Sequence, residues 1–142
     1  MTQARRAWIE QRLRTLRSER THFENVRNGL NGQLGRLREA RDRMNAELST
    51  HGELRRNVRE AMTPIGMNRL RGDNRNRMSN RTTTLYEHLG VQRDRHQENR
   101  DLVNGRITTR EQERDAAVSN LGAVNNEINR LQQELNAVTR IV

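Results

Sequence analysis

Cysteine and lysine are absent from this sequence, and aromatic residues and proline are scarce. Its 142 residues include no Cys, one Pro, one Trp, one Tyr and one Phe. Because there is no thiol, disulfide bridges and thiolate metal sites are excluded. Hydrophobic residues make up only 31% of the chain, less than a compact globular domain of this length normally contains. The composition leaves two classes, an extended helical assembly or a disordered polar chain.

Long apolar runs are missing as well. No run approaches the roughly 18 consecutive apolar residues that a membrane-spanning helix needs. The opening stretch, MTQARRAWIEQRL, has no uninterrupted apolar core of the kind found in secretory signal peptides. We therefore expect no membrane insertion, and a location in the cytoplasm or export without a cleavable signal peptide.

What the sequence does contain is a seven-residue hydrophobic repeat, sustained in two long stretches. We call its a and d positions the seam. In the first stretch the a positions are Arg6, Leu13, Arg20, Arg27, Leu34, Arg41, Leu48, Arg55 and Met62, and the d positions are Ile9, Leu16, Phe23, Leu30, Leu37, Met44, His51 and Val58. In the second the a positions are Tyr86, Arg93, Arg100, Ile107, Arg114, Leu121, Ile128, Leu135 and Val142, and the d positions are Leu89, His96, Val103, Arg110, Ala117, Val124, Leu131 and Val138. A heptad repeat kept this long is typical of coiled-coil helices.

A break separates the two stretches. The sequence Thr63-Pro64-Ile65-Gly66 predicts a helix stop, because proline lacks an N–H donor and restricts the residue before it. Thr82, Thr83 and Thr84 are candidate caps for the next helix, and Glu87 follows Thr84 at the spacing of a capping box. We therefore predict one domain with a first long helix in residues 1–62, a basic loop in residues 63–82 and a second long helix in residues 83–142.

Two helices of nearly equal length around one loop favour an all-α fold, a long antiparallel helical hairpin. At about 1.5 Å per residue each helix would span roughly 90 Å. The matching heptads place Phe23 near Leu121 and Leu16 near Ile128. The seam is continuously apolar from Ala117 onward, so we expect the firmest packing in the C-terminal third and the loosest packing in the middle.

Glycines argue against uninterrupted helices. Gly29, Gly32 and Gly35 lie close together in the first stretch, and each costs about 1 kcal/mol relative to alanine in a helix interior. A turn at Asn28-Gly29 would shift the heptad phase, but the apolar positions continue in phase beyond it. The pattern therefore favours long helices that are softened locally over a bundle of short ones.

Arginine occupies the seam repeatedly. All 27 basic residues are arginine, and eight of them fall inside the repeat: Arg20, Arg27, Arg41, Arg55, Arg93, Arg100, Arg110 and Arg114. A buried charge without a partner is too costly to keep. Two interpretations stay open. The long side chains extend from the seam edge toward neighbouring glutamates, or they face an acidic or polar surface of partner helices and set register and partner choice.

Sequence motifs for catalysis are lacking. His51 and His96 fall in the seam and would lie near each other, but two imidazoles without a carboxylate or thiol make a poor metal site. There is no cysteine nucleophile, phosphate-cradling glycine loop or His-Glu metal helix. We expect no enzymatic activity, no catalytic residue, no metal and no cofactor.

The loop between the helices is the most basic segment of a chain whose net charge is +9. We call its candidate binding residues the tip: Arg69, Leu70, Arg71, Gly72, Arg75, Arg77, Met78 and Arg81. Three interpretations stay open: the segment is a solvated flexible loop without a partner, it binds phosphates through counterion release, or it contacts an acidic protein. No aromatic residue is interleaved to stack bases. Acidic protein partners are favoured over nucleic acid, which remains an alternative.

The order of these features, a long helix, a loop with Leu70-Arg71-Gly72, Met78 and a second long helix, resembles the WXG-type helical hairpins of type VII secretion. It is more similar still to the longer relatives encoded beside secreted LXG toxins. In these families a Trp-x-Gly turn joins the helices, and Leu70 stands here in place of the tryptophan. The resemblance implies pairing with partner helices as a secretion substrate, adaptor or targeting chaperone.

The sequence thus predicts a non-enzymatic coiled-coil hairpin that pairs with helices of other chains, as a homo-oligomer or hetero-oligomer, in an assembly, adaptor or secretion-associated chaperone role. One alternative is an architectural protein that binds nucleic acid through its arginines. Another is a scaffold or filament subunit that assembles with itself.

Overall fold

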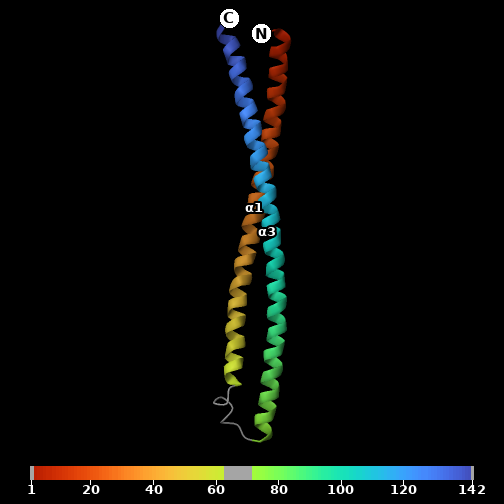
Figure 1. The fold of residues 1–142 in the computed structure, drawn as a ribbon, viewed down its shortest axis with the longest axis vertical. Coiled ribbons are helices and arrows are strands. Elements are labelled where there is room, and N and C mark those ends of the chain that lie inside the picture. The colour runs from red at the N-terminus through yellow and green to blue at the C-terminus, as the bar shows by residue number, and fades with distance from the viewer. Residues whose placement is uncertain (1, 63–71, 142) are drawn as a thin grey trace. The chain divides into compact units, whose positions relative to one another are not determined.

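The computed structural model describes residues 2–62 and 72–141 of the chain. They form two α-helices, α1 (Gln3–Ala61) and α3 (Asp73–Ile141), and the described residues contain no strand. The helices pack side by side in opposite directions (Figure 1). The predicted all-α antiparallel hairpin is confirmed.

The start of α1 is capped by its own sequence. The hydroxyl oxygen of Thr2 accepts a hydrogen bond from the backbone N–H of Arg5 at 3.1 Å. This is the N-cap arrangement, in which a side chain serves one of the unpaired donors of the first turn. The helix ends at Ala61, close to the predicted boundary. The predicted stop at residues 63–66 lies outside the described residues.

The predicted start of the second helix at residue 83 was wrong, because α3 begins at Asp73. Gly72, at φ +64°, precedes the helix, and its carbonyl accepts the N–H of Asn76 at 3.3 Å. No glycine or proline follows before residue 82, so nothing in this stretch stops the helix. The proposed capping threonines are internal. Thr82 and Thr84 donate their hydroxyls to carbonyls one turn earlier, at 2.6 and 2.9 Å, as threonine does inside helices.

Both helices continue through their glycines. Gly29, Gly32 and Gly35 lie within α1, and Gly105 and Gly122 lie within α3. The expectation of long helices over a bundle of short ones is confirmed. The phase of the heptad was the better guide because packing along a continuous stripe outweighs the propensity cost of single glycines.

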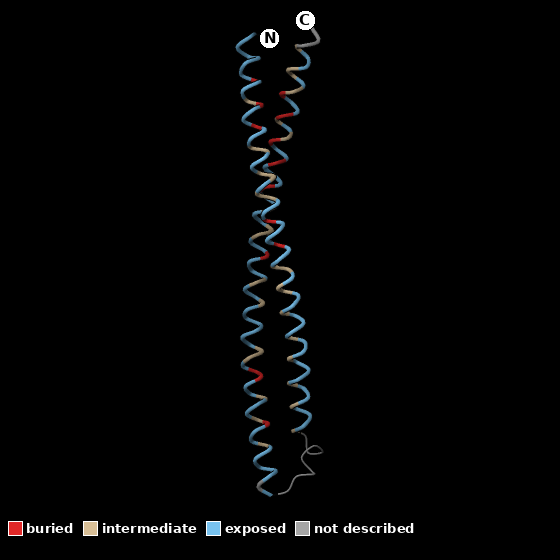
Figure 2. Tube along the Cα trace, turned by 180° about the vertical axis from the view of Figure 1, so that it is seen from behind, coloured by how far each residue is buried: buried red, intermediate tan, exposed pale blue. Residues whose placement is uncertain are grey.

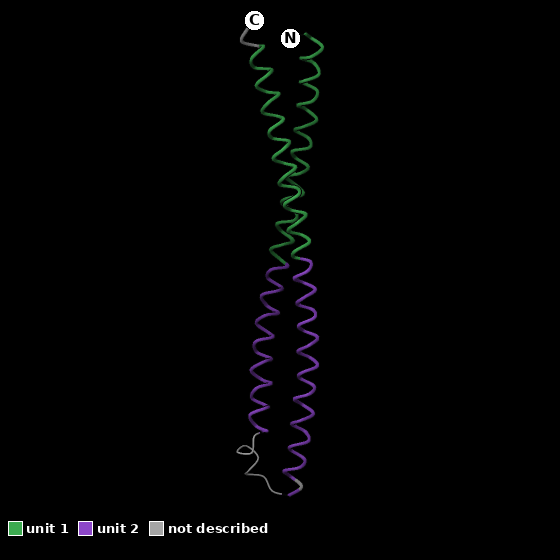
Figure 3. The backbone as a smooth tube through the Cα atoms, in the orientation of Figure 1, with its two compact units in different colours: residues 1–36, 107–142 green, residues 37–106 purple. Residues whose placement is uncertain are grey.

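The chain divides into two compact units (Figure 3). Unit 1 comprises residues 1–36 and 107–142, and unit 2 comprises residues 37–106. Each unit therefore contains one part of α1 and one part of α3.

Burial follows the predicted heptad. Buried residues recur at intervals along both helices (Figure 2). Every buried side chain in the described residues occupies an a or d position, with Thr82 at the d position one heptad before Leu89. Of the described residues at a and d positions, Arg6 and His96 are exposed, and the others are buried or half-buried. The buried side chains are those of Ile9, Leu13, Leu16, Leu30, Leu34, Thr82, Leu89, Ile107, Ala117, Leu121, Val124, Ile128 and Leu131.

Unit 1 holds the apolar core. Ile9, Leu13 and Leu16 of α1 form one cluster with side chains of α3, and Phe23 and Leu135 pack against it. The members from α3 are Val124, Ile128 and Leu131. Leu16 and Ile128 therefore share a cluster, as the matched heptads predicted, and the continuously apolar part of the second heptad lies in the core.

Unit 2 is less completely closed. Leu89 and Thr82 are its buried side chains among the described residues. Its other apolar aliphatic seam residues are half-buried: Leu37, Met44, Leu48, Val58, Met62 and Val103. The least buried seam thus lies in unit 2 and not across the middle of the hairpin, because Leu30, Leu34 and Ile107 are buried within unit 1.

Candidate functional site, a helix seam lined with arginine

The eight seam arginines all occupy half-buried positions. Unit 1 contains Arg20, Arg27, Arg110 and Arg114, and unit 2 contains Arg41, Arg55, Arg93 and Arg100. A half-buried guanidinium keeps part of its hydration and avoids most of the cost of a fully buried charge. Arginine can therefore occupy these a and d positions because the packed helices leave its side chain partly exposed to water.

Most seam arginines bind the residue that follows them in the chain. Arg41, Arg93, Arg100 and Arg114 pair with Asp42, Asp94, Asp101 and Asp115 at 3.3, 3.1, 3.4 and 3.2 Å, and Arg27 donates to Asn28 at 3.3 Å. Consecutive helix residues do not face each other, so each guanidinium bends out of the seam to reach this partner. The Arg114 side chain is 27% exposed and that of Asp115 is 71% exposed, so the charges meet at the surface.

These pairs support the interpretation in which the arginines extend from the seam edge toward nearby acids. The acids differ from those predicted, since aspartate takes the place of glutamate except at Arg110, which binds Glu113 at 3.0 Å. Surface ion pairs of this kind contribute about 0 to 1 kcal/mol each. The recurring Arg-Asp dipeptide with arginine at position a was the sequence signal for them.

Two ion pairs between the helices of unit 1 were missed. Arg5 donates through Nε and Nη2 to both oxygens of Glu134 at 3.0 Å, and Arg12 does the same to Glu127 at 3.1 and 3.2 Å. The hydrogen bond from Arg5 lowers the pKa of Glu134, and the same bond raises the pKa of Arg5. All four residues occupy heptad g positions, where coiled coils place interhelical ion pairs. The g positions of the heptad were therefore the sequence signal that could have predicted these two ion pairs.

Arg55 of unit 2 is held differently. Its guanidinium carbon lies 4.1 Å from the centre of the Tyr86 ring, a cation–π arrangement. On another side it approaches Gly90, where an added Cβ would lie 3.0 Å from Nη2 of Arg55. The Nε atom of Arg55 is buried and has no hydrogen-bond partner. This guanidinium therefore has a fixed position and an unused donor.

The histidines of unit 2 do lie near each other, as predicted. The ring centres of His51 and His96 are 6.0 Å apart, and Nε2 of His51 lies 3.4 Å from Oε1 of Gln92. Within the described part of the chain no group of three or more His, Cys, Asp or Glu side chains could hold a metal ion.

The described tip residues are exposed. Gly72 precedes α3, and Arg75, Arg77, Met78 and Arg81 lie in its first turns. A hollow of about 320 Å³ is lined by Asn74, Arg77, Met78 and Arg81. Arg69, Leu70 and Arg71 lie outside the described residues. The tip is thus partly helical, and its described arginines project from a helix instead of a loop.

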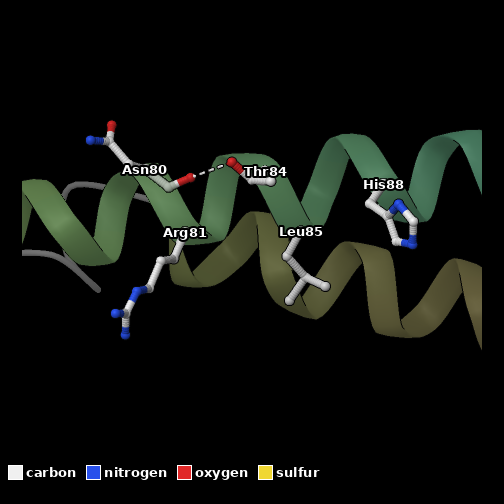
Figure 4. A pocket seen from close by; sticks show the side chains of 5 residues that line it. All are labelled: Asn80, Arg81, Thr84, Leu85 and His88. Atoms are coloured by element: carbon white, nitrogen blue, oxygen red, sulfur yellow. Dashed lines mark hydrogen bonds between the residues drawn. The ribbon is translucent and has the colours of Figure 1, made fainter.

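A second hollow, of about 450 Å³, lies beside the same part of α3 (Figure 4). The side chains described in its lining are Asn80, Arg81, Thr84, Leu85 and His88. The hydroxyl of Thr84 is occupied by its bond to the carbonyl of Asn80. The described lining comes from a single helix and contains no carboxylate, so it shows no paired acid and base.

The chain matches no family model, no curated protein and no solved structure. In the described residues, no helix is both long and apolar enough to cross a membrane.

Proposed function

We propose that this protein is a non-enzymatic coiled-coil hairpin that pairs with helices of a partner chain, as an assembly component, adaptor or secretion-associated chaperone. The half-buried seam of unit 2 carries the proposal. Leu37, Met44, Leu48, Val58 and Val103 retain apolar surface that the two helices leave in contact with water. A further helix laid along this seam would remove that surface, with a gain of about 25 cal/mol per Å².

The charge of the chain favours an acidic partner. The net charge is +9, and three seam arginines of unit 2, Arg41, Arg93 and Arg100, pair with exposed aspartates. A partner helix with carboxylates at its flanking positions could replace the exposed aspartates and fix its own register. Polar residues at a positions are known to exchange stability for such specificity. The resemblance to type VII secretion hairpins supports a secretion-associated form of this function.

The first test is purification from the native source at moderate salt, with and without nuclease, followed by reconstitution with the protein that remains bound. A stoichiometric helical partner that survives nuclease is the expected result. Leu48→Asn, in the seam, should then weaken binding. Leu102→Asn is the matched control, because Leu102 is 66% exposed and lies off the seam. Equal affinity of both variants would count against pairing along the seam.

Binding of nucleic acid is a second candidate, favoured by the exposed Arg75, Arg77 and Arg81 on consecutive turns of α3. It predicts phosphate-backbone binding that weakens steeply as salt rises. Glutamine at these three positions should lower the salt dependence more than glutamine at Arg43, Arg95 and Arg106, which are exposed elsewhere in unit 2. If glutamine at Arg75, Arg77 and Arg81 leaves nucleic-acid binding unchanged, this candidate is rejected.

Assembly of the chain with itself is the remaining alternative. It needs no other protein, because the half-buried seam of one copy would cover that of another. Sedimentation equilibrium across a wide range of concentrations distinguishes it, since the mean mass should then rise with concentration in the absence of any partner.

A further inference from the structure

Four arginines of unit 2 surround one small cavity. Its volume is about 180 Å³, and it is lined by Gly52, Arg55, Arg56 and Arg59 of α1 and by Tyr86 and Arg93 of α3. No carboxylate lines it among the described residues. Because like charges repel at this range, four guanidinium groups around one cavity make a favourable environment for an anion. We propose that this cavity is a binding site for a compact oxyanion, namely a phosphate group.

The position of Arg55 is the first argument for a built site. The guanidinium stacks on the Tyr86 ring at 4.1 Å and passes close to Gly90, where a Cβ would lie 3.0 Å from Nη2 and 3.4 Å from Cζ. A guanidinium stacked by its face leaves its N–H edge free for hydrogen bonds in the plane. That edge matches the paired oxygens of phosphate.

The unused donors are the second argument. Arg56 and Arg59 form no hydrogen bond or ion pair with a carboxylate within the described residues. Arg93 does pair with Asp94, at 3.1 Å, but that aspartate is 62% exposed. A bound phosphate would therefore supply acceptors that this group of residues lacks.

The size of the cavity selects among anions. Pockets for drug-sized ligands span roughly 300 to 1,000 Å³, so 180 Å³ suits a phosphate group better than a whole nucleotide. The Tyr86 face is occupied by Arg55 and is not available to stack a base, which is the usual contact in single-stranded nucleic-acid binding. The geometry favours a phosphate monoester or free phosphate over a nucleic acid.

Calorimetric titration of the full chain with inorganic phosphate, at constant ionic strength, tests the site. We expect saturable binding with one phosphate per chain. Arg59→Gln should weaken it about tenfold, in line with the loss of a charge-assisted hydrogen bond. Arg43, like Arg59, is exposed and lies in unit 2, but it does not line the cavity. Arg43→Gln removes the same charge and should leave the affinity nearly unchanged. Absence of saturable heat, or an equal loss in both variants, would overturn the proposal.

A glycine pair separates loss of the site from loss of the fold. Gly90→Ala places a Cβ against Arg55 and should weaken phosphate binding, while Gly105→Ala, which meets nothing within 4 Å, should not. Alanine favours the helix more than glycine does, so neither variant should melt below the parent chain. If Gly90→Ala binds phosphate like the parent chain, the stacked guanidinium is not part of the site and the proposal fails.

The source of the phosphate is resolved by two further titrations. A short peptide with one phosphoserine tests a phosphate carried by a protein, and it should compete with inorganic phosphate for the same site. A DNA duplex tests a phosphodiester backbone. Binding of the duplex that depends on Arg59, together with no binding of phosphate, would overturn the proposal in favour of nucleic acid.

Discussion

Units 1 and 2 carry the same heptad repeat but exclude water to different degrees. In unit 1 residues such as Ile9, Leu16 and Leu131 are 0 to 1% exposed. In unit 2 the buried side chains among the described residues are Leu89, at 6%, and Thr82, at 9%. The comparison shows that heptad spacing selects the helix and the face it presents. The size and polarity of the side chains on that face decide whether it closes.

Contacts between the helices differ in the same way. Unit 1 is joined at its edge by the ion pairs of Arg5 with Glu134 and of Arg12 with Glu127. In unit 2 the helices meet through Arg55 over Tyr86 and through His51 beside His96. Unit 1 thus combines an apolar core with a charged edge, whereas polar and aromatic groups of unit 2 lie in the seam itself.

The largest expected difference is the cost of deleting a seam leucine. Leu131→Ala in unit 1 removes a side chain that is 0% exposed and should lower the free energy of unfolding by about 3 kcal/mol. Leu48→Ala in unit 2 removes a half-buried one and should cost about 1 kcal/mol. Urea denaturation followed by circular dichroism measures both. Equal losses would mean that the two units are equally well packed.

Replacement of seam arginines should act in the opposite direction. Arg27→Leu in unit 1 and Arg41→Leu in unit 2 exchange a solvated pair with a neighbour for apolar burial. Each should raise the free energy of unfolding by about 1 kcal/mol and reduce discrimination between partner helices. Arg43→Leu, at an exposed position off the seam, is the control and should change stability by less than about 0.5 kcal/mol. A sharp loss at Arg41 would show that its guanidinium is required within the fold.

For glycine replacements, the difference in stability change between the two units should be smaller. Gly122→Ala in unit 1 meets no atom within 4 Å and should stabilise the helix by up to about 1 kcal/mol. Gly90→Ala in unit 2 should gain less, because its Cβ displaces the guanidinium of Arg55. Thermal unfolding of both variants tests this order, and a larger gain at Gly90 would contradict the stacked arrangement.

The smallest expected effect is the pH dependence of stability that arises from the ion pair between Arg5 and Glu134 at the edge of unit 1. Arg5 holds the pKa of Glu134 below its ordinary value of 4.5. The stabilisation from this carboxylate is therefore present above pH 4.5 and is lost as pH falls through the lower pKa of the folded state. Melting temperatures of the parent chain and of Glu134→Gln should differ at neutral pH and converge in acid. A difference that does not change with pH would exclude the ion pair as its cause.

Much of the fold was predictable because periodicity is a local property. Spacing alone assigned the a and d positions, and residues as far apart as Ile9 and Leu131 proved to be buried where the heptad put them. The start of α3 was not predicted, because the polar stretch after Gly72 has no apolar repeat to mark it as helix. Its threonines resemble caps in sequence and bond inside the helix in the structure.

The candidate site was predictable only in part. Sequence placed arginine in the seam, but the acids that it meets lie one position further along the same helix. The prediction named neighbouring glutamates, because the pattern alone did not distinguish them from the aspartates. The meeting of Arg55, Tyr86 and Gly90 depends on two segments far apart in the chain, and no local motif announces it.

The sequence by itself determined the helices, their continuity through glycine and the stripe along which they pack, because each follows from propensity and spacing within one segment. Only the tertiary structure decided that burial continues through Leu30, Leu34 and Ile107 and that the least closed part of the stripe lies in unit 2. It also decided which cations meet around a shared cavity. These outcomes depend on distances between side chains of different helices. Such distances are set when the two surfaces fit together, by side-chain volume, solvation of charge and the space left at a glycine.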